Sequence, residues 1–142
     1  MAREIDFQGK TKDTGKWITG NLYFSNKSHN SFELQYFEGV QIETKVTVNV
    51  LAKFFVIPET IGQYTNVLGS DGKKIYEKDI VYNGTYKGEV YWNYSDNGWR
   101  IAVTDINNQM FDTKLNSTYR VIGHRYDELV AANYFIRQGE FI

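Results

Sequence analysis

The chain has 142 residues, of which 42% are hydrophobic, with sixteen Lys and Arg, seventeen Asp and Glu, one Pro and no Cys. This length and composition predict one compact soluble domain or two small ones, and the absence of Cys excludes disulfides, thiolate metal sites and a Cys nucleophile. The formal net charge of −1 provides no global field to attract nucleic acid, polyphosphate or anionic lipid, although a local basic face would be invisible in this sum.

The first part of the chain predicts an opening hairpin and a loop. The turn residues Asp13-Thr14-Gly15 separate an alternating start at Ile5 and Phe7 from the β-favouring run at 17–24. The polar run at 25–31 has almost nothing to bury, so we predict a loop there.

The next segment shows a period of two, which is typical of a half-buried strand. The alternating apolar residues are Val40, Ile42, Val46, Val48 and Val50. We predict neighbouring strands over 32–37 and 52–57. Pro58 has no backbone donor for a ladder, so we place an internal boundary there. It divides an N-terminal β subdomain, 1–57, from a small barrel-like subdomain, 58–142.

Turn residues separate the predicted strands in the second half of the chain. Gly69-Ser70-Asp71-Gly72 predicts a tight turn before a strand over 74–82. Gly123, inside a predicted strand at 119–126, indicates a β-bulge or a close backbone approach. Asp127 precedes an amphipathic pattern at 129–136, which predicts a short C-terminal helix.

A hairpin is predicted over 90–103. Asn97-Gly98 is the dipeptide that best tolerates the two positive φ angles of a type I′ turn, and a two-residue loop would pair Asp96 with Trp99. In that register one face of the hairpin is apolar and the other presents Tyr91 and Arg100. The apolar face would contain Val90, Trp92, Tyr94, Ile101 and Val103.

These elements together predict a mostly β fold. Eight or nine short strands with glycine-rich turns indicate one or two small antiparallel barrels or sandwich-like sheets, followed by the short C-terminal helix. No run approaches the ~20 apolar residues that a membrane helix needs, and the start of the chain lacks the apolar core of a secretory signal. We therefore expect a cytoplasmic protein with no membrane partner.

No catalytic motif emerges. His29 and His124 lack a second ligand at zinc spacing, and the turn at 69–74 lacks the Ser or Thr that follows the lysine of a P-loop. The carboxylate pairs Glu77 with Asp79 and Asp105 with Asp112 would suit acid–base or metal chemistry, but a solvated strand edge explains them more simply. We predict no enzyme, no cofactor and no metal, and keep a divalent-ion-dependent hydrolase as a minor alternative.

The densest aromatic region lies between Tyr82 and Trp99. Core packing explains Trp92 and Tyr94 best, whereas Tyr91 and Arg100 on the other face are candidates for an exposed contact surface. Aromatic side chains beside a cation can stack on bases, so a nucleic-acid-binding small β-barrel is the alternative function. The charges between residues 70 and 100 nearly cancel, so no basic groove supports it.

The most distinctive motif of the chain is PETIGQYT at 58–65, and further short motifs stand at 3–5, 7–10, 13–17, 20–22, 71–81, 121–123 and Tyr126. In order and spacing these segments resemble the YopX-like family of phage and prophage proteins. The middle, 25–53, diverges. Family members commonly carry Arg where Gln8 stands and Gly where Lys78 stands. If the turn before Asp79 requires a positive φ, Lys78 bears a strain that Gly would not.

The resemblance implies a protein encoded by phages or prophages, without an assigned reaction, that forms homo-oligomers. It assigns no catalytic residue. We interpret 62–65 chiefly as a folding signature, with Gly62 for a turn and Tyr64 for a buried ring, and keep Gln63 and Tyr64 as candidate contact residues. We therefore expect a phage accessory protein in the bacterial host cytoplasm. Its predicted role is a non-enzymatic binding or assembly module that forms a homo-oligomer, with a phage or host protein as a further partner.

Overall fold

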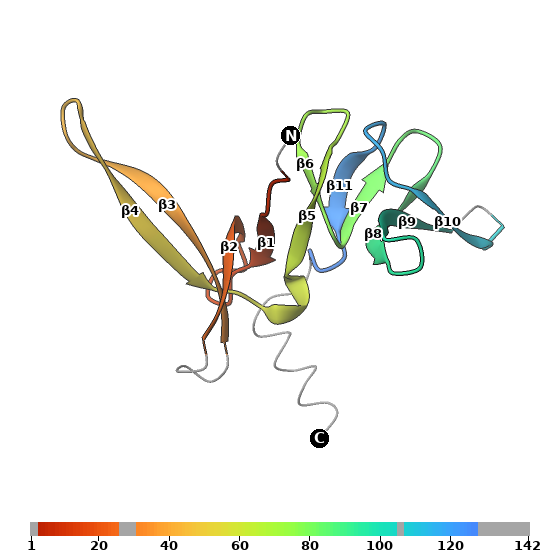
Figure 1. Ribbon diagram of the computed structural model, residues 1–142, viewed down its shortest axis with the longest axis horizontal. Coiled ribbons are helices and arrows are strands. Elements are labelled where there is room, and N and C mark those ends of the chain that lie inside the picture. Colours follow the sequence, from red (N-terminus) through yellow and green to blue (C-terminus); the bar gives the residue numbers. More distant parts are fainter. Residues whose placement is uncertain (1–2, 26–30, 105–106, 128–142) are drawn as a thin grey trace, which may run out of the picture. The chain divides into compact units, whose positions relative to one another are not determined.

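A computed structural model describes residues 3–25, 31–104 and 107–127 (Figure 1). These residues form two compact units, one of residues 6–61 and the other of residues 3–5 with 62–127. Both are built from antiparallel strands, so the predicted mostly β class is confirmed. Within the described ranges the one helical element is the 3-10 helix η1 (Pro58–Thr60). The predicted C-terminal helix lies outside the described residues, and a boundary between separate subdomains at Pro58 stays a prediction.

The unit of residues 6–61 contains four antiparallel strands in the order β4-β3-β2-β1. They are β1 (Phe7–Lys10), β2 (Trp17–Ser25), β3 (Ser31–Glu43) and β4 (Val46–Phe55). Strands β1 and β2 pair with Phe7 opposite Gly20, which confirms the predicted opening hairpin. Leu34, Val56 and Ile57 are fully buried, and Leu34 and Val56 lie against Gly9 of β1.

The segment predicted as one half-buried strand is instead a hairpin. The chain turns at Thr44 and Lys45, where Lys45 has a φ of 68°, and Val40 of β3 lies opposite Val48 of β4. The alternating apolar side chains are exposed. The prediction was wrong because Thr44-Lys45 contains none of the Gly, Pro or Asn that usually mark a turn, while the alternation continues on both sides of it.

The second unit contains a hairpin and a five-stranded sheet. The hairpin pairs β5 (Gly62–Leu68) with β6 (Lys74–Tyr76). The sheet has the order β10-β9-β8-β7-β11, and its strands are β7 (Asp79–Tyr82), β8 (Lys87–Asn93), β9 (Gly98–Thr104), β10 (Met110–Lys114) and β11 (Arg120–His124). Its core cluster contains Ile75, Val81, Val90, Ile101, Val103, Leu115 and Tyr119.

Neither sheet closes into a barrel within the described residues. Strands β10 and β11 are the edges of the five-stranded sheet and do not pair with each other. The antiparallel sheets were predicted correctly, but the predicted barrel was wrong. Alternation in a sequence sets the two faces of a sheet, whereas barrel closure depends on strand tilt and stagger, which alternation does not encode.

The β8–β9 hairpin has the predicted faces but not the predicted register. Asn93 pairs with Gly98 and Trp92 with Trp99, so the loop has four residues, 94–97, instead of two. The Asn93 side chain explains the wider loop, because its Oδ1 accepts the N–H of Ser95 at 2.8 Å. The type I′ turn predicted at Asn97-Gly98 was therefore wrong.

The side chains lie on the predicted faces because the observed pairing differs from the predicted pairing by an even number of residues. Val90, Ile101 and Val103 are buried in the core, as predicted, and Tyr91 and Arg100 lie on the opposite face.

Two other local predictions are confirmed. Gly72 closes the tight turn at 69–72 with a φ of 79° and an N–H donated to Gly69 O at 2.9 Å, and the β7–β11 register shifts between Val121 and Gly123, as a bulge requires.

Lys78 has a φ of 75°, in the left-handed region that favours glycine. Its backbone is fixed from both sides, because its N–H donates to Val90 O at 2.9 Å and its C=O accepts the N–H of Arg125 at 3.0 Å. A rotation of the backbone away from this φ would break these hydrogen bonds, so Lys78 stays in the left-handed region. The turn before Asp79 therefore does require a positive φ, at the position where family members commonly carry Gly and this chain carries Lys78.

We expect Lys78→Gly to raise the free energy of unfolding by about 0.5–1 kcal/mol, because Gly adopts this φ without a steric penalty. Urea denaturation followed by circular dichroism measures the change. Lys87→Gly is the matched control: it also removes a lysine, but in strand β8, where Gly should destabilise by about 0.5–1 kcal/mol. Equal loss of stability in both variants would show that Lys78 is not strained.

Candidate functional site

The β3–β4 hairpin extends beyond β2 as a two-stranded ribbon, which we call the arm (residues 36–52). Strand β2 pairs with β3 only over Ser31–Gln35, so the rest of β3 has β4 as its sole strand neighbour among the described residues. Figure 1 shows the arm continuing past the end of β2. Among the described residues the arm therefore has no third strand. A two-stranded ribbon alone is at best marginally stable in water.

Both faces of the arm expose large apolar side chains. Phe37 is 71% exposed, and Leu51 lies opposite it on the same face. The other face continues outward from the buried Leu34 and exposes Val40, Ile42, Val46, Val48 and Val50. Soluble proteins rarely expose a contiguous apolar surface of this kind unless a partner covers it. The arm is therefore a candidate interaction surface.

The free edge of the arm is strand β4. The N–H of Val56 donates to Phe32 O at 3.0 Å, and antiparallel bonds alternate, so the even-numbered residues of β4 bond to β3 while the odd-numbered residues point their N–H and C=O outward. Phe55 follows this rule, because its outward C=O accepts the N–H of Lys12 at 2.9 Å. The remaining outward residues are Thr47, Asn49, Leu51 and Lys53.

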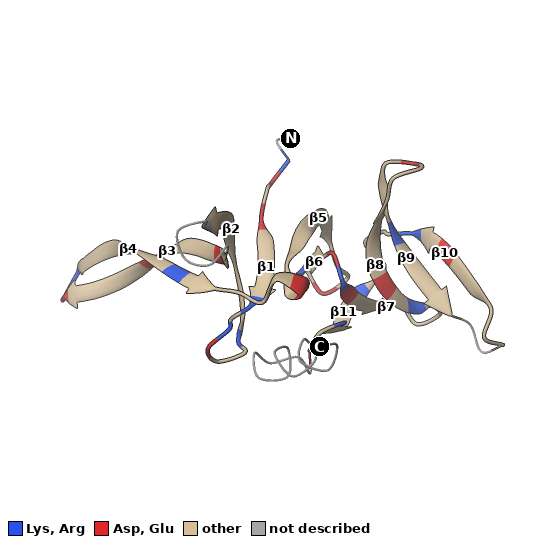
Figure 2. Ribbon diagram, turned by 90° about the horizontal axis from the view of Figure 1, so that it is seen from below, with Lys and Arg blue, Asp and Glu red and all other residues tan. Residues whose placement is uncertain are grey.

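Edge strands are usually protected by charges, proline or bulges. Charged residues are sparse along β4 (Figure 2), where Lys53 is the one charged residue and no proline occurs. No second strand pairs with this edge within the described parts of the chain. The edge thus offers a row of backbone donors and acceptors beside apolar side chains.

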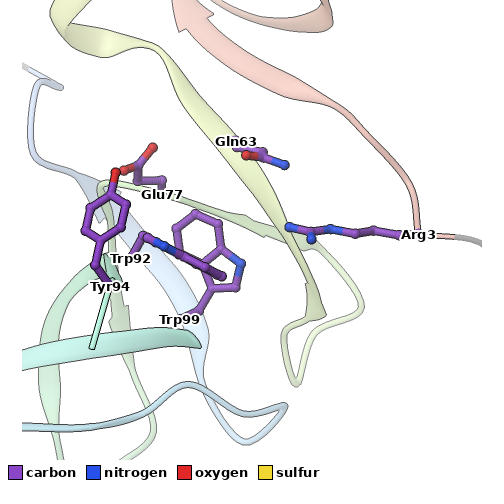
Figure 3. Close-up of a pocket in the computed structure, with 6 residues that line it drawn as sticks. All are labelled: Arg3, Gln63, Glu77, Trp92, Tyr94 and Trp99. Carbon is purple, nitrogen blue, oxygen red and sulfur yellow. The ribbon is translucent and has the colours of Figure 1, made fainter. Parts of the chain in front are cut away.

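The second unit contains a pocket of about 370 Å³ (Figure 3). It is lined by Arg3, Gln63, Glu77, Trp92, Tyr94 and Trp99. Trp92 and Trp99 face each other across β8 and β9, with ring centroids 5.0 Å apart and planes at 71°. Both rings are half-buried, and Trp99 packs against the core cluster. Tyr94, in the four-residue loop, is 85% exposed.

Two polar side chains of this pocket are held together by the backbone. Glu77 follows β6, and its N–H donates to Gln63 O in β5 at 3.0 Å. Gly62 permits this close approach, because a Cβ there would collide with Glu77 O. Gly62 therefore serves a close backbone contact in a strand, and the turn predicted for it was wrong.

Arg3 reaches the pocket because the residue after it is fixed to β5. Glu4 N–H donates to Asn66 Oδ1 and Asn66 Nδ2 donates to Glu4 O, both at 2.9 Å. The Glu4 carboxylate also pairs with Lys74 Nζ at 2.8 Å. Figure 3 shows the Arg3 side chain directed toward the tryptophans from the side away from Glu77.

The four contact residues predicted from sequence are not brought together. Gln63 lines the pocket, whereas Tyr64 is buried, with its ring 5.6 Å from that of Tyr76. Tyr91 and Arg100 lie on the other face of the β8–β9 hairpin. Their role in contacts stays a prediction. Sequence reasoning missed Arg3, because the neighbouring Glu4 is fixed by Asn66, more than sixty positions away. It assigned Tyr94 to the core because it assumed the tighter loop.

Tyr91, Arg100 and Asp112 form an ionic cluster. The Tyr91 hydroxyl donates to Asp112 Oδ2 at 2.9 Å, and Arg100 bridges Asp112 and Asp96, the latter at 3.0 Å. The Tyr91 hydrogen bond, followed by that of Arg100, holds the pKa of Asp112 below its ordinary value. A ligand anion would have to compete with two carboxylates for Arg100, so this face is a poor phosphate site.

The remaining candidates for chemistry have structural contacts. The buried Asp79 accepts the N–H of Tyr76 at 2.8 Å, and His124 Nδ1 accepts the N–H of Tyr126 at 3.0 Å. His29 and Asp105 lie outside the described residues. Across the described ranges, no group of three or more His, Asp or Glu side chains is placed to hold a metal ion. No helix in those ranges is long and apolar enough to cross a membrane.

A protein-family model described as YopX protein matches residues 6–129 of the chain. The match confirms the resemblance predicted from the sequence. It spans the arm and five of the six pocket residues, with Arg3 lying before it. No curated protein matches the chain.

We expect Gly62→Ala to destabilise the protein by about 2 kcal/mol, because the added methyl group must displace the Glu77 backbone. Thermal and urea denaturation measure the loss. Gly98→Ala is the matched control in another strand, where the nearest atom lies 3.8 Å from the new Cβ, so we expect little change. Similar costs at both positions would contradict the close approach.

We also expect the pKa of Asp112 to lie below the ordinary value of about 3.9 and to rise toward it in Tyr91→Phe. A lowered carboxyl pKa gives stabilisation that is present above pH ~3.9 and is lost as the pH falls through the lowered pKa. Carboxyl-carbon NMR titration measures the pKa directly. Tyr82→Phe is the control, because it removes a hydroxyl that makes no contact with Asp112 in the structure, and it should leave this titration unchanged. An ordinary pKa of Asp112 in the unmodified chain would refute the cluster.

Proposed function

Because the chain belongs to the YopX protein family, which indicates a phage-type protein, we propose that it is a non-enzymatic assembly module that forms a homodimer through the β4 edge. The observation that carries this proposal is the long, nearly uncharged edge strand with exposed apolar side chains on both faces. A second copy is the occupant that fits best, because the strand is complementary to itself.

Self-complementarity follows from the register. When two β4 strands pair antiparallel with Val50 on the two-fold axis, Asn49 faces Leu51 and Thr47 faces Lys53 of the other copy. Val50 is the midpoint of 47–53, so this register gives every outward residue of that segment a hydrogen-bonding partner. Such an interface is isologous, as expected for a two-fold dimer.

The same register extends the apolar surface. Val48 faces Ala52 and Val46 faces Phe54 of the other copy, so apolar side chains meet apolar side chains across the axis. Lys53 faces Thr47 and does not face its own copy, which avoids a like-charge pair. A shift of one residue would set this apolar face against the more polar face. The paired arms would form a four-stranded sheet, in which each arm gains a third strand and is stabilised by it.

The absence of cysteine from the chain makes single-cysteine cross-linking a direct test. Val50→Cys places two thiols in a non-hydrogen-bonded pair with Cα atoms about 4.5 Å apart, within the range for a disulfide. We expect this variant to form a covalent dimer under mild oxidation. Val40→Cys is the matched control, because the exposed fractions of Val40 and Val50 are similar, 39% and 46%. In the dimer the two β3 strands would be separated by about 14 Å, so this variant should not form the disulfide.

Sedimentation of the unmodified chain over a range of concentrations should show a dimer that Asn49→Pro shifts toward monomer. Proline at Asn49 removes an outward N–H but no bond to β3, so circular dichroism should be unchanged. A monomer at every concentration, or equal cross-linking of the two cysteine variants, would overturn the proposal.

A further inference from the structure

The aromatic pocket plays no part in the β4 interface, and its composition points to a ligand of its own. It combines two half-buried tryptophans, an exposed tyrosine, a carboxylate, an amide and a guanidinium. We propose that this pocket binds the guanine base and the adjacent phosphate of a nucleotide. Three features of the pocket support this ligand: its aromatic walls, its polar edge and the separation of its charges.

The aromatic walls suit a planar ring. Trp92 and Trp99 meet at 71°, so a base that stacks on the face of one indole meets the edge of the other. Stacking on exposed aromatic side chains is the common way in which proteins hold single bases. Tyr94 is 85% exposed beside this pair, and a bound ring would cover part of its surface. Core packing accounts for Trp99 in part, but not for the exposure of Tyr94.

The polar edge distinguishes guanine from the other bases. The carboxylate of Glu77 only accepts hydrogen bonds, whereas the amide of Gln63 both donates and accepts. Guanine presents N–H donors at N1 and N2 beside an acceptor at O6, which match the carboxylate and the amide respectively. Adenine presents an unprotonated N1 at the corresponding place, so it would direct a lone pair at the carboxylate. The backbone bond between Glu77 and Gln63 keeps the two residues that carry these groups next to each other.

The charges lie at opposite ends of the pocket. Figure 3 shows Glu77 on one side of the tryptophans and Arg3 on the other. A guanidinium binds phosphate with paired hydrogen bonds, and the reciprocal Glu4–Asn66 bonds hold the backbone beside Arg3 in place. A neutral sugar would use the aromatic walls and Glu77 but would leave the guanidinium without a matching anion. A nucleotide uses all of these groups.

The test measures tryptophan fluorescence of the intact chain in a Trp17→Phe background, which leaves Trp92 and Trp99 as the reporters. We expect GMP to quench the emission saturably, and AMP to bind at least tenfold more weakly. Glu77→Gln should weaken GMP binding at least tenfold and remove the preference over AMP. Glu89→Gln is the control, because this carboxylate pairs with Arg125 outside the pocket and its loss should not alter binding.

Arg3→Gln should weaken GMP binding while leaving guanosine, which has no phosphate, unaffected. A second arm compares GMP with a short single-stranded oligonucleotide that contains one guanine. Tighter binding of the oligonucleotide identifies a nucleic acid strand as the source of the base, and tighter binding of GMP identifies a free nucleotide. Circular dichroism confirms that each variant is folded.

Absence of saturable quenching by both GMP and the oligonucleotide would overturn the proposal. Equal binding of GMP and AMP would also overturn it, and so would binding of a neutral oligosaccharide in place of nucleotides. The dimer test uses cysteine positions on the arm, so its outcome is independent of this one.

Discussion

The turn at Glu77–Asp79 is the constraint on which the second unit depends. Three consecutive residues bond to four segments: Glu77 N–H donates to Gln63 O, Lys78 bonds through its backbone to Val90 and Arg125, and Asp79 accepts the N–H of Tyr76. These bonds join β5, β6, β8 and the chain after β11 at one point. The positive φ of Lys78 is the cost of satisfying all of them in so short a segment, and the position of Glu77 in the pocket is a consequence.

The arm presents the opposite situation, because the described residues of its unit leave the outward backbone groups of β4 without a strand partner and its apolar side chains exposed. Leu34 is fully buried at the base of the arm, whereas Val40 on the same face of β3 is exposed. The alternation that makes a core face near β2 continues beyond the residues that β2 covers. Charged side chains at such positions would suit a strand edge that stays unpaired, so the exposed valines fit the partner strand that we propose.

Much of the fold could be predicted from alternation and turn residues, because a period of two determines which side chains share a face. Val90 and Ile101 were therefore assigned to the right face even though the loop between their strands was wrong, since Asn93 competed for the turn through its side chain. Hairpin 40–50 was missed for the related reason that Thr44-Lys45 gives no local signal. The pocket was beyond prediction, because Asn66 bonds to Glu4 and so fixes the backbone beside Arg3, and such distant pairing leaves no pattern in one sequence.

The near-zero net charge constrains how a pocket of this kind can work. With no net positive charge to attract phosphates, affinity in the proposed pocket must come mainly from stacking and hydrogen bonds to one base, with one phosphate contact at Arg3. Binding at a single pocket would therefore be modest and would depend only weakly on salt, because few counterions are released. The proposed dimer would carry two of the proposed pockets, and linked sites raise the overall affinity for a strand that can reach both. If both proposals hold, assembly through the arm would compensate for the low net charge of the single chain.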